Sequence, residues 1–248
     1  MMKMRKTHLS VILILFLVSG LNIRSSELQA LNFESDAVTI KKCQDFKITG
    51  MGDSDSWKNT DWITLTPQGQ NISAYNTKVK VLYSGTGIYF LFNCEDKKLT
   101  TTMKADNLDL YREDVVEVFL WTDENLPVYF EYELSPMNYE LPIIVPNNNG
   151  SFLGWLPWHY EGDRKTRHAT SAVGGEKMSG SSVSGWMAEF YIPFELLKPL
   201  KQVPPLSGTK WRANMYRIDY DNGAAHFSWQ KTNRSFHEYN NFGTFIFE

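Results

Sequence analysis

The sequence lacks the features that would assign it to several common classes of protein. Its formal net charge of -3 over 248 residues provides no basic surface for nucleic acid, which is therefore excluded as a partner. No CxxC or HxxxH spacing is present, which argues against a zinc site, and no GxSxG pattern indicates a serine nucleophile. Long helical periodicity is also scarce, so an all-helical fold is not expected.

Cysteine is rare as well, with only Cys43 and Cys94 in the chain. An oxidising compartment would favour a disulfide bridge between them. The alternative is a pair of free, buried thiols. Both stay open at this stage, because a bridge requires the two Cα atoms to lie within ~6 Å and spacing does not show that.

The N-terminus has the pattern of an export signal. Lys3, Arg5 and Lys6 precede an apolar run at residues 9–18, which is interrupted only by a serine. This run is shorter than the ~20 apolar residues that a membrane-spanning helix needs. It therefore predicts a cleaved secretory signal peptide, with no membrane span left after its removal.

The signal is expected to occupy residues 1–30, with cleavage anywhere from Gly20 to Ala30. Residues 31–248 are then a single domain, which is secreted or periplasmic. No cysteine directly follows the apolar run, so a lipid-anchored export signal is not expected.

Short strand-like runs between turn residues dominate the rest of the chain. They predict an all-β sandwich of two mainly antiparallel sheets, with long loops and at most short helices. The clearest hairpin joins residues 77–83 to residues 88–92 through Ser-Gly-Thr-Gly. Residues 193–197 are the one helical candidate, and residues 138–162 and 174–185 are expected to be long loops. Further strands are predicted at 114–121, 128–134, 168–173, 185–192, 210–218, 225–230 and 242–247.

The strand at residues 114–121 contains an unusual carboxylate. The period of two along a strand places Glu117 on a face whose other side chains are apolar. Either Glu117 faces an aromatic binding pocket, or it is a buried acid held by donors such as Arg217 or Asn214.

Acidic residues on neighbouring strands suggest a second function. Asp114, Glu117, Glu131 and Glu133 lie on two strands that are expected to pair, and paired carboxyl groups are the catalytic unit of glycoside hydrolases. A hydrolase acting through Glu117 with Glu131 or Glu133 is therefore one hypothesis. A solvated sheet face is the alternative.

No cofactor is expected, although two ligand sets remain conceivable. Asp53, Asp55 and Asp96 could hold a structural calcium ion, and each is equally interpreted as a turn residue. Met215 and His226 are the pair that could bind a haem iron.

Aromatic residues in the expected loops are more informative, because aromatic rings stack on the apolar faces of sugars. A basic run at residues 164–168 follows two of these loop tryptophans, and arginine can bind acidic or polyhydroxyl ligands. The loop residues are Tyr111, Trp155, Trp158, Tyr160, Phe236 and Tyr239, whereas Trp57, Trp62, Trp186 and Trp211 are interpreted as core.

Seven segments form an ordered set along the chain: DSDSWKNTDW, VKVLYSGTGIYFLFNCED, LYREDVVEVFLW, YFEYELSP, GWMAEFYIPFELL, KWRANMYRIDY and SFHEYNNFGTFIF. In this order they resemble the carbohydrate-binding modules of family 9 and their wider relatives, whose fold is a β-sandwich. The resemblance covers nearly everything from about residue 48 to residue 248. It implies a non-catalytic, stand-alone exported protein that binds a carbohydrate and supports polysaccharide catabolism.

The resemblance also implies a site. Two aromatic side chains clamp a sugar ring in that family, and they correspond to Tyr111 and Phe236, while Glu117 and Asn233 match its polar contacts. Arg217, Trp155 and Trp158 complete the expected ligand-binding set. The best-described clamps use two tryptophans, and binding members can carry a basic residue where this chain has Glu131. A hydrolase, or an envelope interaction domain without sugar binding, remains the alternative.

Overall fold

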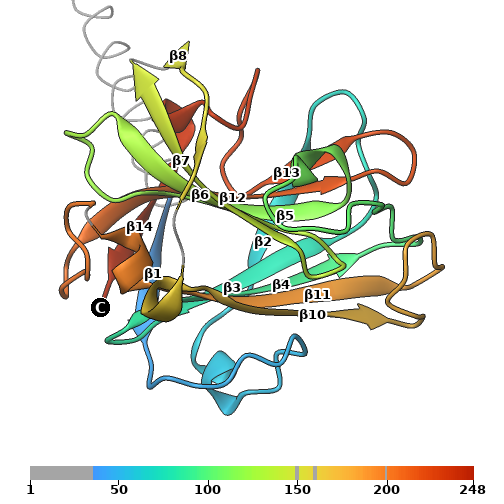
Figure 1. Cartoon of the computed structure of the whole chain (residues 1–248), viewed down its shortest axis with the longest axis horizontal. Helices are drawn as coiled ribbons and strands as arrows, with labels where there is room; N and C mark the ends of the chain where they lie inside the picture. Colours follow the sequence, from blue (N-terminus) through green and yellow to red (C-terminus); the bar gives the residue numbers. More distant parts are fainter. Residues whose placement is uncertain (1–35, 149–150, 159–160, 199) are drawn as a thin grey trace, which may run out of the picture. The chain divides into compact units, whose positions relative to one another are not determined.

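Two layers of β-strands face each other across an apolar core in the computed structural model (Figure 1), which describes residues 36–148, 151–158, 161–198 and 200–248. The expected signal peptide and its cleavage site lie outside the described residues, as does Tyr160. Among the residues that are described, no helix is both long and apolar enough to cross a bilayer. The unit described below runs from Val38 to Glu248.

The upper layer in Figure 1 contains β5, β6, β7 and β12, and the lower layer contains β3, β4, β10 and β11. Their bounds are β3 (Thr77–Tyr83), β4 (Gly87–Glu95), β5 (Val115–Trp121), β6 (Val128–Leu134), β7 (Glu140–Asn148), β10 (Arg167–Val173), β11 (Gly185–Pro193) and β12 (Lys210–Asp219).

Four further strands connect the layers into one hydrogen-bonded path. β1 (Ala37–Lys42) and β14 (Gly243–Phe247) lie between β3 and β12, and β2 (Ile63–Gln68) pairs with both β3 and β13 (Ala225–Ser228). The pairing of β1 with β3 is parallel, and the pairs that β2 to β14 form with one another are antiparallel. The predicted sandwich of mainly antiparallel sheets is confirmed.

The remaining elements are short. They are β8 (Ser151–Phe152), β9 (Leu156–Pro157), the four-residue helix α2 (Phe194–Leu197), and the 3-10 helices η1 (Asp55–Asn59), η2 (Leu110–Arg112), η3 (Gly162–Arg164) and η4 (Tyr239–Asn241). The predicted strands are found within three residues of their expected ends, and α2 lies where the helical candidate was expected.

One expectation about the loops is wrong. Residues 138–162 contain β7, which pairs with the whole of β6 from Val128 opposite Pro146 to Leu134 opposite Glu140. Two prolines, Pro142 and Pro146, made this segment look unlike a strand because proline donates no ladder hydrogen bond. β7 tolerates them because its outer side meets only the two-residue strands β8 and β9.

The core has three parts, which the alternation along the strands explains. Val116, Val118 and Leu120 point from β5 into the space between the layers, where Trp186 and Trp211 are also buried. Trp57 of η1 covers the outer face of the lower layer, with the half-buried Trp62 beside it, so these four tryptophans are structural. Each buried side chain of this size stabilises the fold by about 1.5–3 kcal/mol. The third part covers the outer face of the upper layer, which carries the site.

The disulfide alternative is wrong, and both cysteines are free thiols. The Cys43 amide donates to the Tyr83 carbonyl at one end of β3, whereas Cys94 lies opposite Thr77 at the other end. Six residues of strand separate these positions by about 20 Å. Burial raises the pKa of the Cys94 thiol to about 12 and that of Cys43 to about 11, so neither is a reactive thiolate.

Candidate functional site

The register of β5 against β6 brings three carboxyl groups to one face of the upper layer. Glu117 lies opposite Glu133, and Phe119 lies opposite Glu131. Residues that face each other across an antiparallel pair point to the same side of the sheet. Because Val116 and Val118 point into the core, Glu117 must point away from it. The interpretation that Glu117 faces a pocket is therefore correct.

A cavity of about 410 Å³ lies over these carboxyl groups. Glu117, Glu131 and Glu133 line it from the strands, with further residues of β2, β5, β7, β12 and β13, and three other segments contribute walls. The first is η2 with Tyr111, the second carries Phe152 and Trp155, and the third is the segment at residues 232–237, with Asn233, Phe236 and His237.

The loop at residues 232–237 is held against β12 by its own contacts. The Phe236 ring stacks on Tyr216 with 4.0 Å between ring centroids, and the Tyr216 hydroxyl donates to the Phe236 carbonyl at 2.9 Å. The Glu238 carboxylate accepts from the backbone amides of Asn233 and Arg234 at 2.8 and 2.9 Å. Phe236 and Asn233 are therefore positioned at the cavity before any ligand binds.

Tyr111 reaches the cavity from η2 and not from the strand itself. Its ring keeps 37% of its surface exposed, and its carbonyl accepts from the Tyr220 hydroxyl at 2.9 Å. A backbone hydrogen bond also connects Tyr111 to the Glu133 carboxyl group. Tyr111 and Glu117 therefore share one cavity, although the period of a strand does not relate them.

The three glutamates are almost completely buried, at 2% exposure for Glu117 and Glu133 and 3% for Glu131. Burial raises the pKa of each carboxyl group well above its ordinary value, and the charge of a neighbouring carboxylate raises it further. A hydrogen bond with Glu133 opposes the shift at Glu131, and one with the Tyr111 backbone opposes it at Glu133. One oxygen of each group has no hydrogen-bond partner among the described residues. The raised pKa favours the protonated form of each group, a carboxylic acid that can both donate and accept hydrogen bonds.

His237 does not supply a positive charge to these acids. Its Nδ1 lies 3.7 Å from Glu131 and 2.6 Å from the Tyr129 hydroxyl. Burial lowers the pKa of His237 to about 4, so the imidazole is neutral where the carboxyl groups are protonated. Its ring stacks on Phe152 with 4.3 Å between centroids and forms part of the wall.

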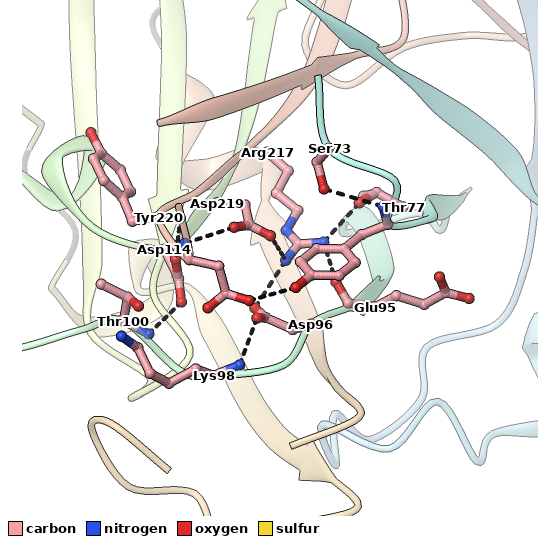
Figure 2. A network of polar contacts seen from close by, with 12 residues as sticks. Ser73, Thr77, Glu95, Asp96, Lys98, Thr100, Asp114, Arg217, Asp219 and Tyr220 are labelled. Carbon is pink, nitrogen blue, oxygen red and sulfur yellow. Dashed lines mark hydrogen bonds and ion pairs between the residues drawn. The ribbon is translucent and has the colours of Figure 1, made fainter. Parts of the chain in front are cut away.

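Arg217 was expected to bond the ligand, and that expectation is wrong. It pairs with Val116 and points to the opposite side of the sheet from Glu117. Its side chain is 0% exposed, and its guanidinium lies 2.9 Å from both Asp96 and Asp219. Figure 2 marks both ion pairs. Asn214 is also occupied, because its amide donates to the Tyr216 hydroxyl and the Gln230 carbonyl. Neither residue holds Glu117.

Asp114 belongs to the Arg217 side and not to the cavity. Its carboxyl group accepts from the backbone amides of Thr100 and Tyr220 (Figure 2). Burial, with a contribution from Asp96, raises the pKa of Asp114 to about 8. Burial also raises the pKa of Asp96 to about 6, and Arg217 opposes that shift. Asp114 is therefore a structural acid and drops out of the hydrolase hypothesis.

The acids considered for calcium do not form one site. Asp53 accepts from the Thr49 hydroxyl and Asp55 pairs with Lys58, both at the surface. Within the described residues, the one group of three carboxylates close enough to share an ion is Asp96, Asp219 and Asp221. Arg217 already contacts two of these three.

Trp158, the remaining residue of the expected ligand-binding set, lies outside the cavity. Trp158 is half-buried against the core between the layers, and its indole N–H donates to the Leu196 carbonyl at 2.7 Å. The basic run is distributed over structural contacts. Arg164 lies beside Trp158, Arg167 lies over the Tyr191 ring, and His168 lies 3.5 Å from Glu140.

The two residues considered as haem ligands are separated, because Met215 is buried in the core and His226 lines the cavity.

Sequence reasoning missed Phe152 and His237 as wall residues. Phe152 lies in the segment expected to be a structureless loop, and β8 places it. His237 follows Phe236 directly, so the segment that carried Phe236 could have suggested it. Trp155, in contrast, was expected at the site and lines the cavity.

A β-sandwich with a preformed cavity on the outer face of one sheet, lined by loop aromatics and strand carboxyl groups, has the architecture of a ligand-binding module. A family model described as "Carbohydrate family 9 binding domain-like" matches residues 48–248. The chain therefore belongs to this family, as its seven segments predicted.

Solved structures agree on the fold. A candidate carbohydrate-binding protein from Bacteroides uniformis ATCC 8492 aligns with a TM-score of 0.70 at 15% identity, over 86% of this chain and 99% of that one. A family 9 module from Caldicellulosiruptor kristjanssonii in complex with cellotriose aligns with a TM-score of 0.60 at 17% identity, over 86% and 93%. The same organism's family 9 module in complex with glucose gives 0.60 at 15% identity, over 86% and 95%. No curated protein sequence matches significantly.

Proposed function

We propose that this protein binds a carbohydrate, with a sugar ring held at Tyr111 and Phe236 above the carboxyl groups of Glu117, Glu131 and Glu133. One observation carries the proposal: rings from separate loops and buried carboxyl oxygens without partners line the same cavity. Rings suit the apolar faces of a sugar, and carboxyl and amide groups suit its hydroxyls. Family membership and the sugar complexes of two similar structures support the proposal.

Tyr and Phe in place of two tryptophans give a smaller stacking area, so we expect modest affinity for a single ring. Trp155 and Phe152 extend the aromatic surface beyond the first pair. This extension suits an oligosaccharide better than a monosaccharide, because further rings add contact area.

Hydrolysis is less well supported. A glycosidase needs one ionised carboxylate and one protonated acid, so the environments of the two groups must set their pKa values apart. Burial is the largest cause of the raised pKa of Glu117, Glu131 and Glu133, and no arginine or lysine among the described residues forms an ion pair that would keep one of them ionised. We therefore favour binding without turnover.

Calorimetry after a glycan-array screen tests the binding proposal. Tyr111→Ala should weaken binding of the selected glycan about five- to tenfold, the value of one stacked ring. Trp62→Ala is the matched control, because it removes an aromatic ring from the outer face of the other layer. The proposal fails if no glycan binds, or if Tyr111→Ala binds as well as wild type. Release of reducing sugar would favour the hydrolase instead.

We further propose that the protein is exported and holds polysaccharide fragments outside the cytoplasm. The basic residues and apolar run of residues 1–30 support export. The buried, unreactive thiols are compatible with an oxidising compartment. Cell fractionation and N-terminal mass spectrometry test this: an intact N-terminus in the cytoplasmic fraction would contradict it.

A further inference from the structure

The cavity contains three acids and no protein cation to balance them. Among its described lining residues, the basic side chains are Arg234, His226 and His237. The Arg234 side chain is 93% exposed and its Nε lies 3.8 Å from Glu238, so it points out of the cavity. Burial lowers the pKa of both histidines.

Burying a carboxyl oxygen without a hydrogen-bond partner costs free energy, and each of these three neighbouring glutamates has one such oxygen. Glu117 and Glu133 face each other across neighbouring strands, and Glu131 follows on the same face. Their unpartnered oxygens are Oε1 of Glu117 and Oε2 of Glu131 and of Glu133. A cation among them would satisfy these oxygens and remove the repulsion that ionisation would otherwise create.

The walls favour a cation as well. The faces of aromatic rings attract an ammonium group, and the rings of Tyr111, Trp155 and Phe236 line the same cavity. Aromatic walls with acidic groups behind them recognise an ammonium ion attached to an apolar frame. A neutral sugar would use only part of this complementarity.

We propose that the sugar bound here is a hexosamine with a free amino group, whose ammonium lies among the carboxyl groups of Glu117, Glu131 and Glu133. The inference rests on the proposed function, because it names the class of sugar for that same site. A carboxyl group that pairs with the ammonium gives its proton to the solvent, so binding releases protons from the protein.

Other titratable groups near the three glutamates do not account for such a release. Burial raises the pKa of Tyr129, Tyr216 and Tyr220, so they stay protonated through neutral pH. The groups that face the glutamates are Tyr129 of β6, Tyr216 of β12, Tyr111 of η2, Tyr220 after β12, Asp109 before η2 and His237 of the loop at 232–237.

Three β-1,4-linked trimers that differ only at C2 test the inference by calorimetry on the purified full chain. They are the glucosamine trimer, its N-acetylated form and cellotriose. At about pH 6.5, where such an amine is protonated, we expect the glucosamine trimer to bind at least about tenfold more tightly than the others. Its binding heat should vary with the ionisation enthalpy of the buffer, which reports proton release, and that of cellotriose should not.

Two variants locate the effect. Glu131→Gln keeps the size of the side chain and removes its acid, and it should abolish most of the preference and reduce the proton release. Glu124→Gln is the control for net charge, because Glu124 is 61% exposed and outside the cavity. Circular dichroism checks folding, and Glu133→Gln replaces Glu131→Gln if that variant does not fold.

Each outcome decides between the two proposals. If cellotriose or the acetylated trimer binds as tightly as the glucosamine trimer, the charged-sugar inference is overturned and carbohydrate binding stands. A preference that survives in Glu131→Gln, or in Glu133→Gln where that variant replaces it, also overturns it. If neither the trimers nor the glycan array shows binding, the proposed function itself fails.

Discussion

Two groups of buried acids lie on opposite sides of the upper layer, and they differ in one respect. Asp96 and Asp219 share the guanidinium of Arg217, which is buried with them (Figure 2). Glu117, Glu131 and Glu133, on the outer face, form no ion pair with an arginine or lysine among the described residues, because Arg234 at the cavity is 93% exposed and lies beside Glu238. In the first group the protein supplies its own counter-charge. In the second group the unpaired oxygens point to a ligand.

Burial alone does not distinguish a structural acid from an acid that binds a ligand. All these acids are almost inaccessible, and burial raises the pKa of each. What separates a structural acid from a binding acid is the partner of its carboxyl oxygens. Arg217 has the charge expected of a sugar-binding residue, yet it stabilises the fold.

The largest loss of stability is expected when Arg217, which pairs with Asp96 and Asp219, is replaced. Arg217→Met would leave Asp96 and Asp219 buried without a counter-ion, which costs about 3–5 kcal/mol in the free energy of unfolding. Urea denaturation measures this loss. Arg234→Met, at a side chain that is 93% exposed, is the control and should change stability by less than about 0.5 kcal/mol. Equal stabilities for the two variants would remove the distinction between the groups.

A smaller change in stability, and one of opposite sign, is expected when Glu117 of the cavity is replaced. The folded-state pKa of Glu117 is raised, so the folded protein binds more protons than the unfolded chain between the two pKa values. Wild-type stability should therefore fall as the pH rises above the unfolded value of ~4.3. Glu117→Gln removes this term and should be more stable than wild type by ~1 kcal/mol or more at about pH 8.

Urea denaturation at several pH values checks this prediction. Near pH 4 the difference between Glu117→Gln and wild type should largely disappear, because the carboxyl group is then protonated in both states. Glu124→Gln should follow wild type throughout, since its carboxylate is mostly exposed. Parallel curves for wild type and Glu117→Gln would mean that Glu117 is stabilised by a partner.

The smallest effect on stability is expected from calcium. Asp96, Asp219 and Asp221 are close enough to share an ion, but Arg217 already supplies positive charge to two of them. We therefore expect neither calcium nor a chelator to change Tm. A rise in Tm with calcium, by linkage between ion binding and folding, would show that the group at Arg217 is also a ligand site.

Much of the fold was predictable because local patterns dictated it. Period-two alternation located β3 and β6 at their observed residues, and it placed Glu117 on a different face from Val116. β7 was missed because two prolines concealed a strand whose outer neighbours are very short.

The site was predictable only in part. Tyr111, Glu117, Asn233, Phe236 and Trp155 were expected and share one cavity. Arg217 and Trp158 were expected and lie elsewhere. Their side chains suit a sugar chemically, but nothing local to either residue reveals which way it points.

By itself, the sequence determined a β-sandwich, an acid on an apolar strand face and aromatic residues in the adjacent loops. Those features depend on the periodicity of the backbone, which the order of residues specifies directly. The tertiary structure decided which acids meet a cation. The register of β12 against β5 pairs Arg217 with Val116, sends its charge to Asp96 and Asp219, and leaves the three glutamates of the cavity without an arginine or lysine partner in the described chain.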